Sequence, residues 1–415
     1  MTGQQRTEEE VRAEVRAWLD ANWDADRHLV EWRRLLADAG WAVPSWPKRW
    51  HGRELPAWAD KLVADELRRA GAVGTPLGAG MSLAAPTIMT HGSDELRTRI
   101  LRPTITGEVT WTQLFSEPGA GSDLAGLTTT ARRDGDDFVV NGQKVWNTSA
   151  HHADFGMLLA RTDWEVPKHQ GISYFVLPMD QPGVVVRPIL QMNRHSSFNE
   201  VFLTDARIPA ANLVGALGDG WRVARTTLMH ERTFATLRRP SFAGGARGRT
   251  IEEAAAEAAD HFATYAWYPQ RAGRADLVIE RAHHFGRTED PIVRQAIAEL
   301  LSFQRAHEWT AERARAARTL GRAPGPEGSL GKLAASGVAR RSARVHGLIA
   351  GGSALLTDGP NDLDAVIAEV LVSTPAQSIA GGTDEIQHNI IGENILGLPR
   401  EPNTDRDLAF RDVPR

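Results

Sequence analysis

Two patterns of hydrophobic and polar positions alternate along the chain, and the first of them predicts a helical domain. Over residues 8–100, apolar residues recur every three or four positions in EEVRAEVRAWLDANW, LVEWRRLLADAGW and ADKLVADELRRAG, and Gly or Pro separates these segments. This spacing is typical of amphipathic helices, because it places the apolar residues on one helical face. We therefore expect an N-terminal helical domain over residues 1–108.

After about residue 108 the pattern changes to short runs rich in β-branched and aromatic residues, such as DFVVNGQKVWNTS, ISYFVLP and EVFLTDARI. Runs of this length and composition favour strands. Two groups of turn-forming residues, Arg133-Asp134-Gly135-Asp136 and Asn141-Gly142, lie among the runs, and such residues are frequent in hairpin turns. The sequence therefore predicts a middle β-barrel or sandwich domain over residues 109–216.

Helical spacing returns at Gly220 and continues to about residue 397. Its strongest segments are RTTLMHERTFATLRR, IEEAAAEAADHFATYAW, PIVRQAIAELLSFQRAHEWTAERARAAR and LGKLAASGVARRSARVHGLIAG. We expect a C-terminal helical domain over residues 217–400, followed by a polar, loosely ordered tail over residues 401–415. Together, the three domains predict an α+β fold class.

Composition and charge narrow the range of functions. The net charge of −4 gives no electrostatic reason to expect nucleic acid as a partner, and the absence of cysteine excludes disulfides and thiolate metal sites. The first 20 residues are charged and lack the apolar core of a signal peptide, and no apolar run approaches about 18 residues. We expect a cytoplasmic protein without a membrane span, whose partner is a small molecule or another protein.

One long segment and three shorter ones carry a family resemblance. Residues 113–163 read QLFSEPGAGSDLAGLTTTARRDGDDFVVNGQKVWNTSAHHADFGMLLARTD. Further segments read FNEVFLTDARIPAANLVG, GDGWRVARTTLMHERT and IAGGTDEIQHNIIGENILGLP. Together with the order of the three domains, these segments resemble the acyl-CoA dehydrogenase family over almost the whole chain.

The resemblance implies a fold, an activity and partners. The fold would have an N-terminal helical domain, a middle β-barrel or sandwich and a C-terminal four-helix bundle. The activity would be oxidation of an acyl-CoA thioester to the 2,3-enoyl-CoA with FAD as cofactor, as part of fatty acid and lipid metabolism. An electron-transferring flavoprotein would accept the electrons, and the chain would form a homotetramer or homodimer.

The resemblance also assigns cofactor contacts residue by residue. It implies that Trp146 packs on the isoalloxazine ring, although a tryptophan taken alone is more often a core aromatic. The glycine-rich turn in SEPGAGSD allows backbone to approach a cofactor closely, and Ser122 would touch both cofactor and substrate. The implied FAD contacts are Gln113, Phe115, Ser116, Gly121, Ser122, Trp146, Thr148, Gln295, Thr383 and Glu385.

The catalytic base needs a separate argument. Removing a proton next to a thioester requires a carboxylate, and many family members carry a glutamate immediately before Gly-Thr. Here Gly381 stands at that position. Other members, such as isovaleryl-CoA and long-chain acyl-CoA dehydrogenases, place the base on another helix immediately before an arginine, which here is Arg232. The resemblance therefore assigns the base to Glu231 and the substrate side of the pocket to Arg232.

Helical spacing supports this choice independently. Ala224, Leu228, Glu231 and Ala235 follow the i, i+4, i+7, i+11 pattern, which places the carboxylate on an apolar stripe. The alternative is an ordinary ion pair between Glu231 and a neighbouring arginine, Arg232 or Arg225, with Arg232 then a solvated surface residue. Both interpretations stay open at this point.

One departure from the family pattern concerns the oligomer. Members often show Arg-x-x-Phe-Gly, from which a neighbouring subunit contacts the FAD pyrophosphate, but here Ala282 stands three residues before Phe285-Gly286. Two histidine pairs, 151–152 and 283–284, lack a carboxylate at metal-ligand spacing, so no metal site is predicted.

Two other functions remain as alternatives to an active dehydrogenase. The chain could be a non-catalytic partner subunit of a hetero-oligomeric acyl-CoA dehydrogenase. It could also be a flavin oxidase or monooxygenase built on the same fold. Neither the acyl chain length nor its branching can be predicted from these residues.

Overall fold

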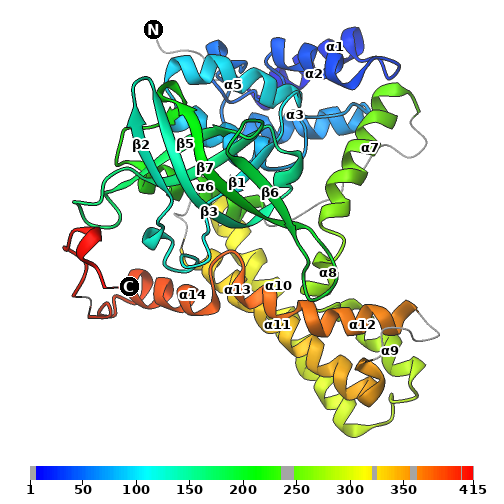
Figure 1. Ribbon diagram of the computed structural model, residues 1–415. Helices are drawn as coiled ribbons and strands as arrows, with labels where there is room; N and C mark the ends of the chain where they lie inside the picture. Colours follow the sequence, from blue (N-terminus) through cyan, green and yellow to red (C-terminus); the bar gives the residue numbers. More distant parts are fainter. Residues whose placement is uncertain (1–5, 235–246, 320–324, 356–361, 403, 415) are drawn as a thin grey trace. The chain divides into compact units, whose positions relative to one another are not determined.

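The computed structural model describes residues 6–234, 247–319, 325–355, 362–402 and 404–414, and Figure 1 shows the order of its elements. The chain divides into two compact units. The first comprises Met1–Ile189, Ser196–Thr264 and Thr404–Arg415, and the second comprises Leu190–His195 and Tyr265–Asn403. Helices, then a sheet, then helices again follow one another along the chain, so the predicted fold class is confirmed.

Two of the first helices, α1 (Glu8–Asn22) and α5 (Asp94–Thr106), begin at residues whose side chains cap them. The others are α2 (Leu29–Asp38), the 3-10 helix η1 (Lys48–Trp50), α3 (Trp58–Arg69), the π-helix η2 (Gly80–Ala84) and α4 (Ala85–His91). Thr7 and Glu10 form a capping box at the start of α1, and the Ser93 hydroxyl accepts a hydrogen bond from the Leu96 amide at the start of α5. Gly107 ends α5 with a φ of +80°, a conformation that favours glycine.

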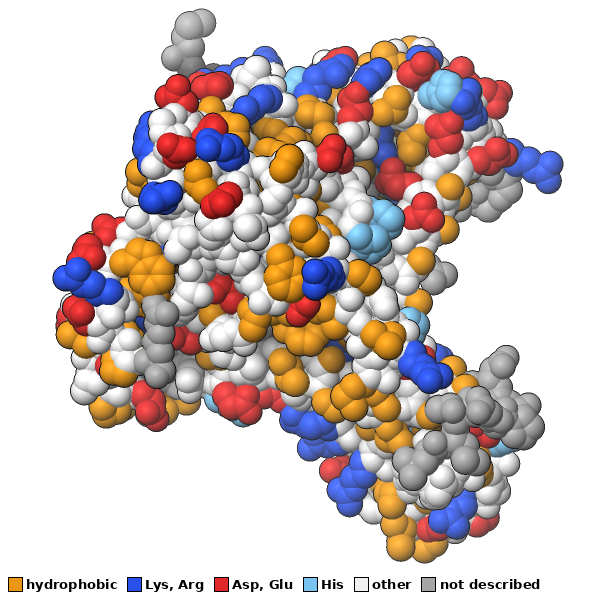
Figure 2. Space-filling model, in the orientation of Figure 1, with side chains coloured by type: hydrophobic (Ala, Val, Ile, Leu, Met, Phe, Trp, Pro, Cys, Tyr) orange, Lys and Arg blue, Asp and Glu red, His pale blue; other side chains and the backbone are white. Residues whose placement is uncertain are grey.

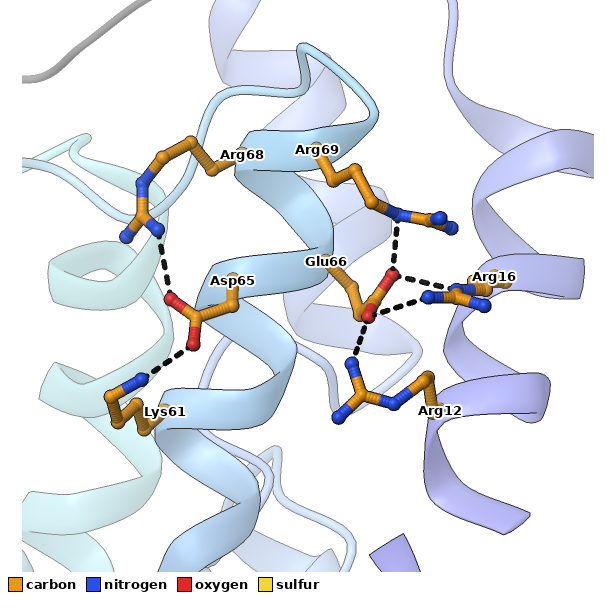
Figure 3. Close-up of polar contacts among 7 residues, drawn as sticks. All are labelled: Arg12, Arg16, Lys61, Asp65, Glu66, Arg68 and Arg69. Carbon is orange, nitrogen blue, oxygen red and sulfur yellow. Dashed lines mark hydrogen bonds and ion pairs between the residues drawn. The ribbon is translucent and has the colours of Figure 1, made fainter. Parts of the chain in front are cut away.

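The helices α1, α2 and α3 share one apolar core, which includes Val15, Trp32 and Leu62. A buried carboxylate joins two of them, as Figure 3 shows. Glu66 of α3 is 2% exposed and pairs with Arg12, Arg16 and Arg69, with a distance of 2.7 Å from Arg16 Nε to Glu66 Oε2. The hydrogen bond from Arg16, together with that from Arg12, holds the pKa of Glu66 below its usual value although burial opposes this.

Eight strands form a single sheet in the order β6-β7-β3-β2-β4-β5-β8, and β1 also pairs with β4. Their bounds are β1 (Trp111–Leu114), β2 (Thr130–Asp134), β3 (Asp137–Thr148), β4 (Phe155–Arg161), β5 (Ile172–Pro178), β6 (Val184–Ile189), β7 (Phe198–Pro209) and β8 (Leu213–Val214). The 3-10 helices η3 (Leu124–Gly126), η4 (Ala150–His152) and η5 (Ala210–Asn212) lie between strands. The strand β4 pairs in parallel with β1 and β2, and the other pairs are antiparallel.

The two groups of turn residues in the β domain have different outcomes. Asp134 pairs with Asp137 across a two-residue turn in which Gly135 has a φ of +61°, so the predicted hairpin forms. Asn141 and Gly142 instead lie inside β3, where a β-bulge shifts its register with β7, so the predicted turn is wrong there. A Cβ on Gly142 would approach Thr129 Oγ1 to 2.3 Å, which explains the glycine by close backbone approach.

The sheet is buried on both faces because its central strands alternate between two cores. Leu158 and Ala160 of β4 face a core shared with β3 and β7. Met157 and Leu159 face a second core that includes Ile88 of α4 and residues of α5. Successive side chains of a strand point to opposite faces, so one apolar run serves both cores.

Two helices that the sequence pattern assigned to the C-terminal domain belong to the first unit. Val223 and Ala224 of α6 (Gly220–Phe234) join the core that contains α4 and α5. The helix α7 (Arg249–Thr264) adds Ile251 and Ala254 to the core of α1–α3. Arg33 of α2 donates to Glu257 of α7 at 2.6 and 2.9 Å, and this ion pair helps to hold α7 against α2.

The second unit is helical. It contains α8 (Tyr268–Arg271), η6 (Ala275–Leu277), α9 (Val278–His284), α10 (Pro291–Thr319), α11 (Glu327–Ala350), η7 (Gly351–Leu355), α12 (Asp362–Ser373), α13 (Pro375–Ile379), α14 (Asp384–Ile390) and the π-helix η8 (Ile391–Ile395). Its core includes Val278, Val293, Leu300 and Val345. The C-terminal helical domain is therefore confirmed.

One stretch of the described chain, Leu363–Ile395, is long and apolar enough by composition to be considered for a membrane span, with a mean hydropathy of 1.2. The stretch is not one continuous helix. Ala380 ends α13 in an extended conformation, and Gly381 and Gly382 both have positive φ values. A core helix of a protein without membrane spans passes the same composition test. The expected absence of a span stays a prediction.

Part of the tail, around Phe410, packs on the β domain. The Phe410 amide donates to the Val166 carbonyl at 3.0 Å, and the Phe410 side chain is 4% exposed. A short 3-10 helix, η9 (Phe410–Asp412), begins at this residue. A single buried aromatic residue thus fixes a segment whose other residues are mostly polar.

The visible face of the molecule carries charged side chains of both signs (Figure 2). Figure 2 shows basic and acidic side chains interspersed on the visible face, without a large area of one sign.

Candidate active site

The candidate base lies beside a residue of the sheet. Gln113 belongs to β1, and Glu231 belongs to α6, which packs on the same core as β1. The Gln113 amide Nε2 lies 3.4 Å from the Glu231 carboxylate Oε2, as donor and acceptor. Both side chains are partly buried. The structure therefore brings together two residues, 118 positions apart in the chain, that the sequence placed in one site.

The glycine-rich loop after β1 is open to a ligand along its backbone. Gly119, Gly121 and Ser122 are exposed, and a Cβ added at Gly119 or Gly121 would meet no described atom within 4 Å. Glu117 and Ala120 exchange backbone hydrogen bonds at 3.1 Å, which closes the turn at the base of the loop. Backbone groups can therefore approach a cofactor here without a steric barrier.

A buried ion pair anchors the start of this loop. Lys144 of β3 is fully buried, and its Nζ donates to Glu117 Oε1 at 2.8 Å and to the Phe115 carbonyl at 3.0 Å. The Glu117 carboxylate also accepts from the amides of Thr128 and Thr129 at 2.7 and 2.9 Å. Burial alone would raise the pKa of Glu117, but the charge of Lys144 and these hydrogen bonds lower it to about 2.

The sequence pattern did not lead us to this pair, although both residues lie within the segment that carries the resemblance. A lysine followed directly by apolar residues in a strand, as in NGQKVW, is a signal that could have found it, because an interior lysine requires a partner.

Trp146 has the exposure expected of a stacking surface. It lies in a register shift of β3 between Lys144 and Asn147, has a φ of +65° and is 58% exposed. A positive φ is strained for a bulky residue, and such strained residues cluster at active sites. The Phe198 ring meets the Trp146 ring edge-on at 5.9 Å and supports it from one side.

The residues around Trp146 are fixed by hydrogen bonds. Asn147 Nδ2 donates to the Gln113 carbonyl at 2.7 Å, and Asn199 Nδ2 donates to the Asn147 carbonyl at 2.9 Å. The Thr148 carbonyl accepts from the Thr112 hydroxyl at 2.9 Å. These bonds join β1 and β7 to β3, so Gln113, Trp146 and Thr148 occupy one rigid part of the sheet.

Two neighbouring sequence assignments involve backbone more than side chains. The Phe115 ring is 4% exposed and packs edge-on against Tyr174 at 5.8 Å, so it faces the core. The Ser116 carbonyl accepts from the Val145 amide at 2.9 Å, which ties the segment after β1 to the strand that carries Trp146.

The remaining predicted contacts lie in the second unit or outside the described side chains. Gln295 is exposed on α10, and Glu385 is exposed in the first turn of α14. The Thr383 hydroxyl accepts from the Ile386 amide at 3.2 Å and caps that helix. The Arg232 side chain lies outside the described residues.

The backbone at position 381, where other family members carry a glutamate, has a conformation that favours glycine. Gly381 has a φ of +69°, and Gly382 follows with a φ of +86°. Residues with a Cβ rarely adopt this region, at a cost of about 1 kcal/mol or more.

The structure also shows what surrounds Ala282, which stands where family members often have an arginine. Ala282 is 2% exposed, and its neighbour Arg281 is fully buried, 3.2 Å from Asp364 and donating to the Leu363 carbonyl at 3.0 Å. Arg287, the other nearby arginine, pairs with Asp290. Within this unit, both arginines near Phe285-Gly286 are therefore engaged by their own chain.

The residues that are present fit a flat, phosphate-bearing cofactor such as FAD. The loop at Gly119 and Gly121 has open space in front of its backbone, and Trp146 offers an exposed ring. The buried Asn147 Oδ1 has no hydrogen-bond partner among the described residues, so an acceptor remains for a ligand or water. No group of three potential metal ligands occurs in the described part of the chain.

Family models match the chain in the order of its predicted domains. The N-terminal, middle and C-terminal domains of acyl-CoA dehydrogenase match residues 3–108, 112–206 and 218–396. The curated acyl-CoA dehydrogenase IpdE1 of Mycobacterium tuberculosis is 34% identical over 417 residues, covering 95% of this chain and 98% of the relative. Acyl-CoA dehydrogenase FadE34 of the same organism is 36% identical over 88% of this chain and 46% of its own length.

The comparison with solved structures gives similar proteins as well. A structure described as the Tcur3481-Tcur3483 steroid ACAD matches with a TM-score of 0.64 and 26% identity, covering 96% of this chain and all of that chain. The ChsE4-ChsE5 complex from Mycobacterium tuberculosis matches with a TM-score of 0.61 and 26% identity, covering 97% and 100%. The chain therefore belongs to the acyl-CoA dehydrogenase family, a family of flavoprotein oxidoreductases.

Proposed function

We propose that the chain is an FAD-dependent dehydrogenase that converts an acyl-CoA thioester to the 2,3-enoyl-CoA, with Glu231 as the base. The observation that carries this proposal is the 3.4 Å contact between Glu231 and Gln113, since Gln113 belongs to the strand that precedes the open glycine-rich loop. It supports the alternative position of the base that Gly381 requires. FAD, when bound, supplies the acceptor for the hydride that leaves C3.

Two residues of the chain would act in the proton transfer, one as the base and one as the group that orients it. Glu231 takes the proton from C2 of the acyl group onto its carboxylate. Gln113 donates its amide hydrogen to that carboxylate and thereby restricts its orientation. Because β1 is joined to β3 by the Asn147 and Thr112 hydrogen bonds, Gln113 is a rigid support.

The cofactor and the substrate can be assigned to further residues. We propose that Gly121 and Ser122 hold the FAD phosphate and ribityl region and that Trp146 and Thr148 lie against the isoalloxazine. Gln295, Thr383, Glu385 and Arg232 remain assigned by resemblance alone. The acyl group is not specified, and a steroid-tailed acyl-CoA deserves testing because one similar solved structure is described as a steroid ACAD.

The assembly and electron acceptor are also proposals. Exposed apolar side chains on the second unit, among them Ile292 at 68%, Trp309 at 60% and Ile379 at 63%, favour a multi-subunit assembly. An electron-transferring flavoprotein would reoxidise the enzyme, and a cytoplasmic location stays a prediction.

A second candidate is a subunit that needs a different partner chain. It is favoured by one observation, the burial of Ala282 and Arg281 where the family pattern provides an arginine for the neighbour's FAD. One similar solved structure, the ChsE4-ChsE5 complex, is described by the names of two different chains. The discriminating measurement is whether the purified chain alone retains FAD in a stoichiometric amount.

The base assignment can be tested with a matched control on the same helix. Glu231→Gln keeps the size of the side chain and removes the carboxylate, whereas Arg225→Gln changes an exposed residue of α6. We expect Glu231→Gln to lower turnover with an accepted acyl-CoA by about a hundredfold or more while FAD content stays unchanged. Arg225→Gln should leave both unchanged, and equal turnover in the two variants would contradict the assignment.

A further inference from the structure

The far end of the glycine-rich loop is held by one buried arginine. Arg161, the last residue of β4, is 1% exposed. Its guanidinium donates to the Ala125 carbonyl at 2.7 Å, to the Leu127 carbonyl at 3.1 Å and to the Lys168 carbonyl at 3.0 Å. One side chain therefore fixes the end of the loop and the β4–β5 connection at the same time.

The β4–β5 connection holds the loop a second time. Lys168 Nζ lies 2.8 Å from each carboxylate oxygen of Asp123, the residue directly after Ser122. Since the Lys168 backbone is itself bound to Arg161, the position of Asp123 depends on the position of the guanidinium. Glu117 anchors the loop at its start, so Arg161 completes a two-point support for residues 118–127.

The C-terminal tail covers this arginine. The Phe410 ring lies over the Arg161 guanidinium, with 3.4 Å between the ring centroid and the guanidinium carbon. Trp164, whose ring is 5.3 Å from that of Phe410, lines the same site. Backbone hydrogen bonds from Phe410 to Val166 and from Arg411 to Trp164 keep the tail in place. A cation facing an aromatic ring is stabilised by the ring electrons, and the ring also excludes water.

We infer that Phe410 is a positioning residue for FAD binding, which acts through Arg161 on the loop that carries Gly121 and Ser122. Without the ring, water reaches the guanidinium and competes with the carbonyls of Ala125 and Leu127. The loop then samples conformations that do not hold the cofactor. The inference rests on the proposed function, since it assumes that this loop binds FAD.

The test separates the aromatic ring from its apolar volume. Phe410→Leu keeps an apolar side chain and loses the ring, Phe410→Tyr keeps the ring, and Arg411→Ala changes the exposed neighbour, which pairs with Glu165. Two quantities are measured on each apoprotein: the Kd for FAD, from flavin fluorescence, and the amide hydrogen exchange of residues 119–127.

We expect Phe410→Leu to raise the Kd for FAD about tenfold and to accelerate exchange in residues 119–127. Phe410→Tyr and Arg411→Ala should match the unmodified chain in both measurements. A Phe410→Leu variant with unchanged Kd and unchanged exchange would overturn the inference, and so would a Phe410→Tyr variant as impaired as the leucine variant. If the unmodified chain binds no FAD, the proposed function fails, while the exchange comparison still decides whether Phe410 orders the loop.

Discussion

Replacing Lys144 with methionine tests the buried ion pair that anchors the glycine-rich loop. Methionine has a similar length but no charge, so the Glu117 carboxylate would stay buried and lose its cation. Glu117 would keep hydrogen bonds from the amides of Thr128 and Thr129. The variant therefore removes the ionic interaction without removing every partner of the carboxylate.

The expected magnitude follows from the pKa of Glu117. Its depression from 4.5 to about 2 corresponds to roughly 3 kcal/mol between the two protonation states. Breaking a buried pair by removing one partner costs about 3–5 kcal/mol, because a charge is left without compensation. We expect Lys144→Met to lower the free energy of unfolding by this amount at pH 7. The double variant Glu117→Gln with Lys144→Met should lose less, since no unpaired charge remains.

The assay is denaturant unfolding followed by tryptophan fluorescence and circular dichroism. Because the folded-state pKa of Glu117 is lower than its unfolded-state value of 4.5, its contribution is present above pH 4.5 and is lost as the pH falls toward 2. The double variant should lack this part of the acid dependence. A Lys144→Met variant within about 1 kcal/mol of the unmodified chain, or a double variant less stable than the single one, would show that the pair does not anchor the loop in this way.

Two further predictions concern stability elsewhere. Glu66→Gln should destabilise the helices α1 and α3 by about 2–3 kcal/mol, because three arginines lose a buried anion (Figure 3). The control Asp65→Asn changes a carboxylate that is 38% exposed and should cost about 0.5 kcal/mol or less. Equal unfolding midpoints for the two variants would contradict this prediction. Burial lowers the pKa of His346 to about 4, so its contribution to stability is present above pH 6.5 and is lost as the pH falls toward 4. His346→Gln should therefore flatten the melting temperature between pH 6.5 and 4, and an unchanged pH profile would count against this role.

Local sequence patterns predicted a turn correctly where only neighbouring residues determine the backbone conformation. The turn at Gly135 needs only local backbone freedom, and its hairpin forms as predicted. Asn141-Gly142 has equally good turn chemistry, but Thr129 packs against it and the strand continues through a bulge. Tertiary contact, which no local pattern contains, overrides the turn preference there.

Long-range packing explains what the sequence pattern did not predict. The helix α7 has an ordinary amphipathic pattern, which shows that it buries a face but not that the face meets α1–α3. The tail composition likewise indicated a loose end, whereas Phe410 is buried against Arg161. One aromatic residue is too weak a signal in a polar segment.

The candidate site was predicted in part. The family resemblance assigned the base to Glu231, the residue before Arg232, and the structure places Glu231 beside Gln113. The pair Glu117 and Lys144 and the support from Arg161 were not predicted, because residues that position a loop make no contact with the reacting atoms. Their roles become visible only when their partners are known.

The most direct test of the proposed function is an anaerobic titration of the purified protein with short, branched, long-chain and steroid-tailed acyl-CoAs, followed by the flavin absorbance. We expect bleaching with at least one of these classes in the unmodified chain and none with that class in Glu231→Gln, although the variant binds FAD equally well. Bleaching that persists in Glu231→Gln would contradict the base assignment. A chain that holds FAD but is bleached by no acyl-CoA would contradict the proposed dehydrogenase.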